Sequence, residues 1–159
     1  IIRYADILLM YAESLNHLTK AYEIKLGDET YSVSRDLNEI KSAFNLVRHR
    51  SGMPGISNND LADEETFQKI LEIERMKEFL HEGQRYFDVR RWGIYEETEN
   101  ETIMGMNVDG SKENFYQRTV PNTSRIGARL VHKKLYLLPI PLNEIRKLPS
   151  CDQNPDWES

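Results

Sequence analysis

Glutamates recur at helical spacing near the middle of the chain, in a segment that is also rich in arginine. After the apolar residues Phe67 and Leu71, steps of three or four residues reach Glu74, Glu78 and Glu82, positions that share one face of an α-helix. Two carboxyl groups in different environments can split their pKa values and act as general acid and base on a glycosidic bond. One hypothesis for the segment is therefore a carboxylate glycosidase.

A structural role for the same residues is favoured over catalysis. Burying a carboxylate without a partner costs free energy or makes the group take up a proton. We therefore expect arginines beside these acids, with each guanidinium holding a carboxylate through two hydrogen bonds. Paired carboxylates stay ionised and do not supply the raised-pKa acid that hydrolysis needs. We therefore predict no catalytic residue, and an internal ion-pair lattice formed by Glu74, Arg75, Glu78, Glu82, Arg85, Asp88, Arg90 and Arg91.

Composition excludes several other classes of function. The chain has 159 residues and a formal charge of -5, which fits one domain. Its basic residues are scattered in doublets such as Arg90-Arg91 and Lys133-Lys134, so we expect no nucleic-acid partner. A single cysteine excludes an internal disulfide. The four histidines lack the paired spacing of a metal site, and we expect no metal and no cofactor.

The elements that would position these residues are mainly helices. The first helix carries an apolar stripe, which Leu9 and Met10 widen to a second face, so we expect it to be packed on two sides. The stripe consists of Tyr4, Ile7, Leu8, Tyr11, Ala12, Leu15 and Leu18. Because the sequence opens within this helical pattern and without an initiator methionine, we expect the native N-terminus to lie upstream.

Two further helices follow a polar stretch, residues 27–34, that is predicted to be a loop. Asp36 or Ser34 can cap a helix that buries Leu37, Ile40, Phe44 and Val47. Asp63 is a candidate cap for the helix that carries the glutamates.

We expect that glutamate-bearing helix to end at Gly83, followed by a shorter helix over residues 85–92. Beyond it the sequence predicts long loops, then an edge strand or extended segment at 135–140 and a short helix opened by Pro141. Trp157 is expected to dock on the body of the protein. The predicted fold is mainly α, with tetratricopeptide-like helical hairpins, long irregular loops and little strand. We predict a single domain, 1–159, with hairpins over 1–93 and a loop-rich segment over 94–159.

Four segments together resemble the C-terminal part of the SusD/RagB family of Bacteroidetes outer-membrane lipoproteins. They are R-Y-A-D-I-L-L-M-Y-A-E-S-L-N from Arg3, R-H-R-S-G-M-P from Arg48, E-R…E-F…E-G-Q-R-Y-F-D-V-R-R-W-G from Glu74, and L-P-I-P-L-N-E-I from Leu138. Their order and spacing match as well. Among the departures, Asp156 replaces the glycine of a closing Q-N-P-G-W pattern.

The resemblance implies a non-catalytic protein for nutrient uptake and polysaccharide utilisation. Such a protein binds an oligosaccharide, or in some members a peptide, on the external face of the outer membrane. It then delivers the ligand to a TonB-dependent SusC-like transporter. The resemblance further implies contact with the membrane only through an N-terminal lipid anchor, which we expect to lie outside this chain. A tetratricopeptide-type protein-interaction scaffold is the second hypothesis, and the glycosidase is the third.

One loop has the composition of a carbohydrate platform. Sugar binding needs an exposed aromatic face, with amides, carboxylates or arginines beside it for the hydroxyl groups. Phe115 and Tyr116 are aromatic, and Asn114 and Arg118 flank them. These four residues are the predicted carbohydrate-binding site. The alternative, which we favour slightly, is that both aromatic rings anchor the loop to the core.

Overall fold

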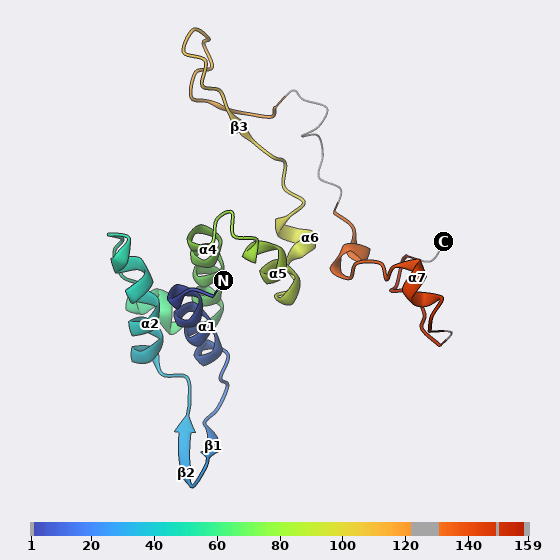
Figure 1. Ribbon diagram of the computed structural model, residues 1–159. Coiled ribbons are helices and arrows are strands. Elements are labelled where there is room, and N and C mark those ends of the chain that lie inside the picture. The colour runs from blue at the N-terminus through green and yellow to red at the C-terminus, as the bar shows by residue number, and fades with distance from the viewer. Residues whose placement is uncertain (1, 122–130, 149, 158–159) are drawn as a thin grey trace. The chain divides into compact units, whose positions relative to one another are not determined.

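The computed structural model describes residues 2–121, 131–148 and 150–157, and most of its regular structure is helical (Figure 1). Backbone contacts divide the chain into two compact units, Ile1–Arg85 and Tyr86–Ser159, which are described separately. The predicted single domain, with its division at residue 93, remains a prediction.

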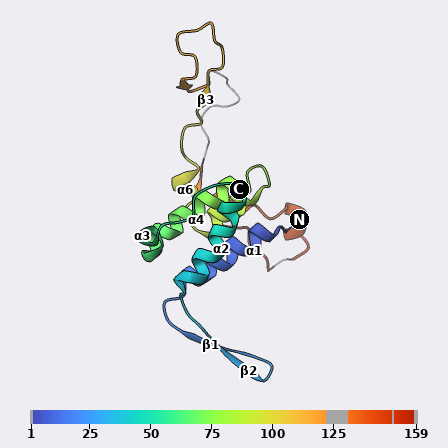
Figure 2. The same ribbon diagram turned by 90° about the vertical axis from the view of Figure 1, so that its left-hand side faces the viewer.

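The first unit is built from helices and one β-hairpin. Helix α1 packs against both α2 and α4, and both views show these three helices together (Figures 1 and 2). The elements of this unit are α1 (Tyr4–Asn16), β1 (Tyr22–Leu26), β2 (Glu29–Val33), α2 (Leu37–Arg50), α3 (Asn58–Ala62) and α4 (Glu64–Glu78).

Large apolar side chains from three helices form the core of the first unit. Leu9 of α1, Phe44 of α2 and Phe67 of α4 are fully buried. The rings of Phe44 and Phe67 meet edge to face with their centroids 5.3 Å apart, a geometry that aromatic pairs favour. The residues predicted to be buried on α2 are confirmed except for Leu37, which is exposed at the first turn.

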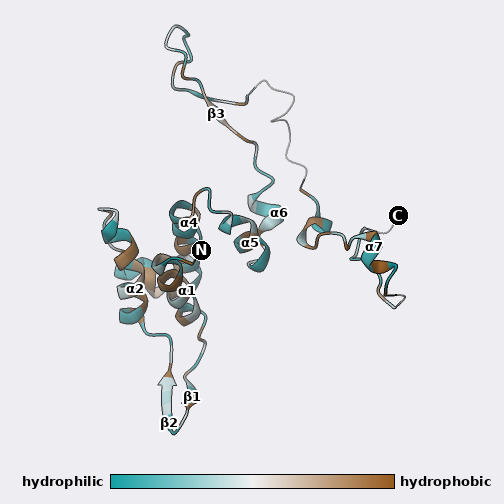
Figure 3. Ribbon diagram, in the orientation of Figure 1, coloured by the Kyte–Doolittle hydropathy of each residue, from teal (hydrophilic) through white to brown (hydrophobic). Residues whose placement is uncertain are grey.

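Helix α1 does not bury most of its predicted apolar stripe. Tyr4 and Ile7 are exposed, and of that stripe only Ala12 and Leu15 are buried. The buried face instead contains Leu9, and it also carries polar residues: Asp6, Glu13 and Asn16. The helix is hydrophobic over much of its length (Figure 3), so its sequence has two apolar faces, either of which could be buried. The small alanines on the face that is buried allow close packing of the neighbouring helices.

The predicted helix caps are confirmed. The Asp36 carboxylate accepts hydrogen bonds from the backbone N–H groups of Asn38 and Glu39 at the start of α2. The Asp63 carboxylate accepts one from Thr66 at the start of α4. Both satisfy donors that a helix N-terminus leaves unpaired. The chain between α2 and Asp63 is not wholly irregular, because Ser57 caps the short helix α3.

The prediction that residues 27–34 form a loop is wrong. They contain the turn and the second strand of an antiparallel hairpin. Tyr22 pairs with Val33 and Leu26 with Glu29 around a turn at Gly27, whose φ of 64° suits glycine. Tyr22, Ile24 and Leu26 lie on one face, a period-two pattern. Each of the three is exposed. The hairpin was missed because its second strand is polar.

The second unit has short elements joined by long connections. It contains most of α5 (Gln84–Arg91), then α6 (Tyr95–Thr98), β3 (Gly105–Met106), β4 (Arg118–Thr119), the 3₁₀-helix η1 (Lys133–Tyr136) and α7 (Leu142–Ile145). The edge strand expected at 135–140 does not form, since η1 occupies its start and no strand follows among the described residues up to 148. Leu137 after η1 has extended backbone, in line with the alternative prediction of an extended segment. The short helix after Pro141 is confirmed as α7.

The C-terminal residues of this unit are fixed by side-chain hydrogen bonds to the backbone. Trp157 donates its indole N–H to the carbonyl oxygens of Lys134 and Leu137, at 3.0 and 2.8 Å. Gln153 exchanges hydrogen bonds with the N–H and carbonyl of Ile140, at 2.7 and 2.9 Å. The expectation that Trp157 docks is therefore confirmed.

Candidate functional site

Glu74, Glu78 and Glu82 are held by arginines from distant parts of the sequence. The Glu74 carboxylate lies 2.6 Å from Nη1 of Arg48. Arg3 and Arg50 both reach Glu78, at 2.8 and 2.6 Å. Arg3 also donates two hydrogen bonds to Glu82, at 3.0 and 2.7 Å. We call these six residues the glutamate–arginine cluster: Arg3, Arg48, Arg50, Glu74, Glu78 and Glu82.

The structure pairs all three glutamates with arginines, but these are not the arginines expected from the sequence. The expected cations came from the same segment, whereas Arg3 precedes α1, and Arg48 and Arg50 end α2. The cations therefore come from the residue before α1 and from the end of α2. Arg3 and Arg48 open two of the motifs that carry the family resemblance, and Arg50 lies within the second of them; this is the signal that could have identified all three.

Glu82 is not on the same helix as the other two glutamates. Helix α4 ends at Glu78, earlier than the predicted end at Gly83. Phe79 is buried, and its ring lies 5.0 Å from the guanidinium carbons of both Arg3 and Arg75. Both contacts are at cation–π distance and stabilise the buried ring. Glu82 reaches Arg3 from that turn.

The charge state of Glu78 argues against acid catalysis. Burial by itself raises the pKa of the Glu78 carboxyl, but the hydrogen bonds from Arg3 and Arg50 together outweigh burial and lower it. A carboxyl that stays ionised to lower pH cannot donate a proton to a leaving group near neutrality. Glu78 therefore has the properties of a structural anion.

The remaining members of the predicted lattice have separate partners. Arg75 is buried and pairs with Asp6 of α1 at 3.3 Å. Asp88 accepts a hydrogen bond from Nε of Arg91 at 2.9 Å. Arg90 donates to the carbonyl oxygens of Tyr86 and Leu135, so it binds backbone where a carboxylate was expected.

Arg85, the last member of the predicted lattice, is half-buried near the start of α5. It is the last residue of the first unit, whereas Asp88 and Arg91 belong to the second. Of the eight residues, Glu74, Glu78 and Glu82 belong to the glutamate–arginine cluster, Arg75 pairs with Asp6, and Asp88 pairs with Arg91.

The predicted carbohydrate-binding residues lie on a short hairpin loop of the second unit. Arg118 pairs with Met106 in the β3–β4 ladder. Asn107 donates its side-chain amide to that of Asn114 at 2.6 Å, and its carbonyl accepts from the backbone N–H of Tyr116 at 2.7 Å. These bonds fix the loop internally and place its four predicted site residues together.

The two aromatic rings of this loop are not buried against a core. Phe115 is 45% exposed and Tyr116 is 65% exposed, so the interpretation that both anchor the loop is wrong. The rings contact each other edge to face with centroids 4.3 Å apart. Tyr116 has a φ of 58°, a conformation that is uncommon for residues other than glycine. The pair forms an exposed aromatic surface, and Arg118, two residues after Tyr116, is also exposed.

No cluster of three histidine, cysteine or acidic residues suited to a metal ion occurs among the residues that the structure describes. In that same part of the chain, no helix is both long and apolar enough to cross a lipid bilayer.

Comparison with protein families decides the relationship that the four motifs suggested. The model of the SusD family matches residues 1–157. The chain belongs to the SusD family. Members of this family are generally glycan-binding proteins of nutrient uptake, act as binding proteins and not as enzymes, and are typically associated with the outer membrane. A comparison with curated proteins found no match.

Solved structures of SusD-like proteins share the fold. A SusD-like protein from Bacteroides fragilis NCTC 9343, BF3747, is 29% identical over 98% of this chain, with a TM-score of 0.73. BT4246 is 28% identical over 99% of the chain, also with a TM-score of 0.73, in its native and selenomethionine forms. The chain spans about a quarter of the length of these proteins, 25%, 23% and 24% respectively. The mainly helical SusD-like fold predicted from the sequence is thereby confirmed.

Proposed function

We propose that this SusD-family protein binds an oligosaccharide at the cell surface and delivers it to a TonB-dependent SusC-like transporter of the outer membrane. It acts there without catalysis, on the external face of the membrane, and the whole protein is held by an N-terminal lipid anchor. Family membership supports glycan capture, and the lowered pKa of Glu78 is consistent with a binding protein.

The observation that carries the proposal within this chain is the exposed pair Phe115–Tyr116. A sugar ring presents C–H groups on one face, which stack on an aromatic ring, and hydroxyl groups at its edge, which need polar partners. The two rings supply the apolar surface. Asn114 and Arg118 supply an amide and a guanidinium on the same loop, and the Asn107–Asn114 hydrogen bond at 2.6 Å reduces the ordering that binding requires.

Binding of the purified chain to a panel of neutral and acidic oligosaccharides, measured by isothermal titration calorimetry, tests this proposal. Tyr116→Ala should weaken binding of any captured glycan about tenfold, since losing a stacked ring costs on the order of 1–2 kcal/mol. Tyr31→Ala is the matched control, because Tyr31 is also an exposed tyrosine on a hairpin. If Tyr116→Ala binds the glycan as tightly as the unaltered chain, the loop is not part of the binding site. If no oligosaccharide of the panel binds, glycan capture by this chain is contradicted.

A protein-interaction scaffold is the second candidate, and the exposed apolar face of α1 favours it. Ile2, Tyr4, Ile7 and Tyr11 are each at least 45% exposed, and exposed apolar patches commonly mark protein contacts. This surface is also compatible with delivery to a transporter. A pull-down of the SusC-like transporter with this protein separates the two roles. Transporter capture that is independent of added glycan and is lost when Ile7 is substituted favours the scaffold. Transporter capture that requires glycan favours delivery.

A further inference from the structure

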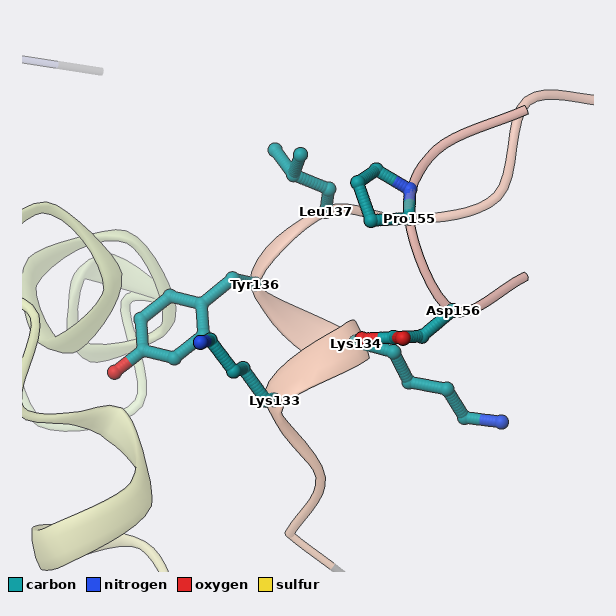
Figure 4. A pocket seen from close by; sticks show the side chains of 6 residues that line it. All are labelled: Lys133, Lys134, Tyr136, Leu137, Pro155 and Asp156. Atoms are coloured by element: carbon teal, nitrogen blue, oxygen red, sulfur yellow. The ribbon is translucent and has the colours of Figure 1, made fainter. Parts of the chain in front are cut away.

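A small cavity in the second unit lies between the 3₁₀-helix η1 and the C-terminal turn (Figure 4). Its volume is about 210 Å³. That is below the roughly 300 to 1,000 Å³ of pockets for drug-sized ligands, so it suits a single small ring. It is lined by Lys133, Lys134, Tyr136, Leu137, Pro155 and Asp156.

The walls of this cavity are fixed before any ligand arrives. Trp157 joins the C-terminal turn to η1 through its two indole hydrogen bonds, and Asn154 donates to the carbonyl of Leu138 at 2.6 Å. The Tyr136 hydroxyl donates to the carbonyl of Gly93 at 2.9 Å, and its ring packs edge to face on Tyr95. A cavity held by backbone contacts loses little conformational entropy on binding.

The cavity combines an apolar wall with a cation. Lys133 and Tyr136 are three residues apart in a 3₁₀-helix, where side chains at that spacing share one face, and Figure 4 shows the Lys133 side chain running toward the Tyr136 ring. Lys134 extends the other way, and its amine lies 4.5 Å from the Trp157 ring. Within the described part of the chain Lys133 has no ion-pair partner, so its amine is available to a ligand.

Asp156 supplies the complementary acceptor in a strained conformation. Its φ is 65°, in the left-handed region that glycine adopts readily and aspartate only occasionally, and it stands where the closing pattern of the family resemblance has glycine. Strained residues often mark functional positions. A carboxylate accepts hydrogen bonds from hydroxyl groups, so Asp156 adds to this cavity a group suited to a polyhydroxylated ligand.

We propose that this cavity binds one carboxylate-bearing sugar unit, a uronic acid, of an acidic oligosaccharide. The Lys133 amine pairs with the sugar carboxylate, Asp156 accepts from ring hydroxyls, and Tyr136, Leu137 and Pro155 contact the C–H face. Two lysines against one aspartate give the cavity a net positive charge, which favours an acidic sugar over a neutral one. This inference rests on the proposed glycan-binding function and narrows its substrate class.

Amide and indole chemical shifts of the ¹⁵N-labelled chain, titrated with methyl glucuronide, test the proposal. The signals of residues 133–137 and the indole N–H of Trp157 should shift, and methyl glucoside, which lacks the carboxylate, should bind more weakly. Lys133→Gln should weaken glucuronide binding about tenfold through loss of one charge-assisted hydrogen bond. Lys147→Gln is the matched control, because Lys147 is an exposed lysine of the same unit that pairs with Glu144 outside the cavity. This substitution should leave glucuronide binding unchanged.

Three outcomes would overturn the assignment. The first is equal binding of glucuronide and glucoside with no effect of Lys133→Gln, and the second is absence of shifts around the cavity. The third is displacement of the glucuronide by acetate at equal concentration, which would reduce the cavity to a simple anion site. If an oligosaccharide binds in a way that depends on Tyr116 and no signal around the cavity shifts, this inference is overturned and the proposed function is still supported.

Discussion

Arg3 and Glu78 form an ion pair of 2.8 Å across 75 residues of sequence. The same guanidinium binds the backbone carbonyl of Glu78 and the carboxylate of Glu82, so one side chain ties the residue before α1 to the end of α4 and the turn that follows. Arg50 brings the end of α2 to the same carboxylate. Glu78 is thus a junction of three chain segments.

Neutralising this junction should destabilise the first unit. Glu78→Gln removes the charge that Arg3 and Arg50 share, and since hydrogen bonds to charged groups contribute about 1.5–3 kcal/mol, we expect a loss of about 1–2 kcal/mol in the free energy of unfolding. Urea unfolding followed by circular dichroism measures it. Glu144→Gln breaks an exposed pair with Lys147 and should cost at most about 0.5 kcal/mol. Equal effects of the two variants would mean that the junction is no stronger than a surface pair.

The stability that Glu78 contributes should depend on pH. The folded pKa of Glu78 lies below its ordinary value of 4.5, so the unfolded chain binds more protons at acid pH. The contribution is therefore complete above about pH 4.5 and is lost as the pH falls through the folded pKa. Urea midpoints from about pH 7 to about pH 3 should fall less steeply for Glu78→Gln than for the unaltered chain. Parallel curves would show that Glu78 titrates alike in both states.

Replacing Asp156 with glycine should stabilise the C-terminal turn. Its φ of 65° is unfavourable for a residue with a side chain, and relieving it should gain about 0.5–1 kcal/mol. Thermal unfolding by calorimetry would show the gain. Asp152 is a nearby exposed aspartate without positive φ, and Asp152→Gly should give no gain. A loss of stability in Asp156→Gly would mean that its carboxylate holds the turn.

Truncating the aromatic pair in the core should be far more damaging than truncating an exposed ring. Phe67→Ala removes a fully buried ring that packs on Phe44, and we expect a loss of about 3–5 kcal/mol. Phe115→Ala, at a half-exposed ring, should change the free energy of unfolding by about 1 kcal/mol or less. Chemical denaturation of both variants measures the difference. A large loss for Phe115→Ala would restore an anchoring role for that ring.

Local signals in the sequence were sufficient for the elements that depend on neighbouring residues. The caps at Asp36 and Asp63, the buried face of α2 and the short helix after Pro141 were all predicted, because each rests on contacts within a few positions. The hairpin at Tyr22–Val33 was missed, since its second strand is polar and only the pairing with the first one holds it.

Contacts between distant segments decided the rest. The sequence alone established a mainly helical chain, its relation to the SusD family and the need of the glutamates for arginine partners. Only the tertiary structure decided that Arg3, Arg48 and Arg50 are those partners, and that α1 buries Leu9 and leaves Ile7 exposed. The physical reason is that a helix with two apolar faces and a segment with excess arginine each allow several arrangements of similar local energy, and packing between helices selects one.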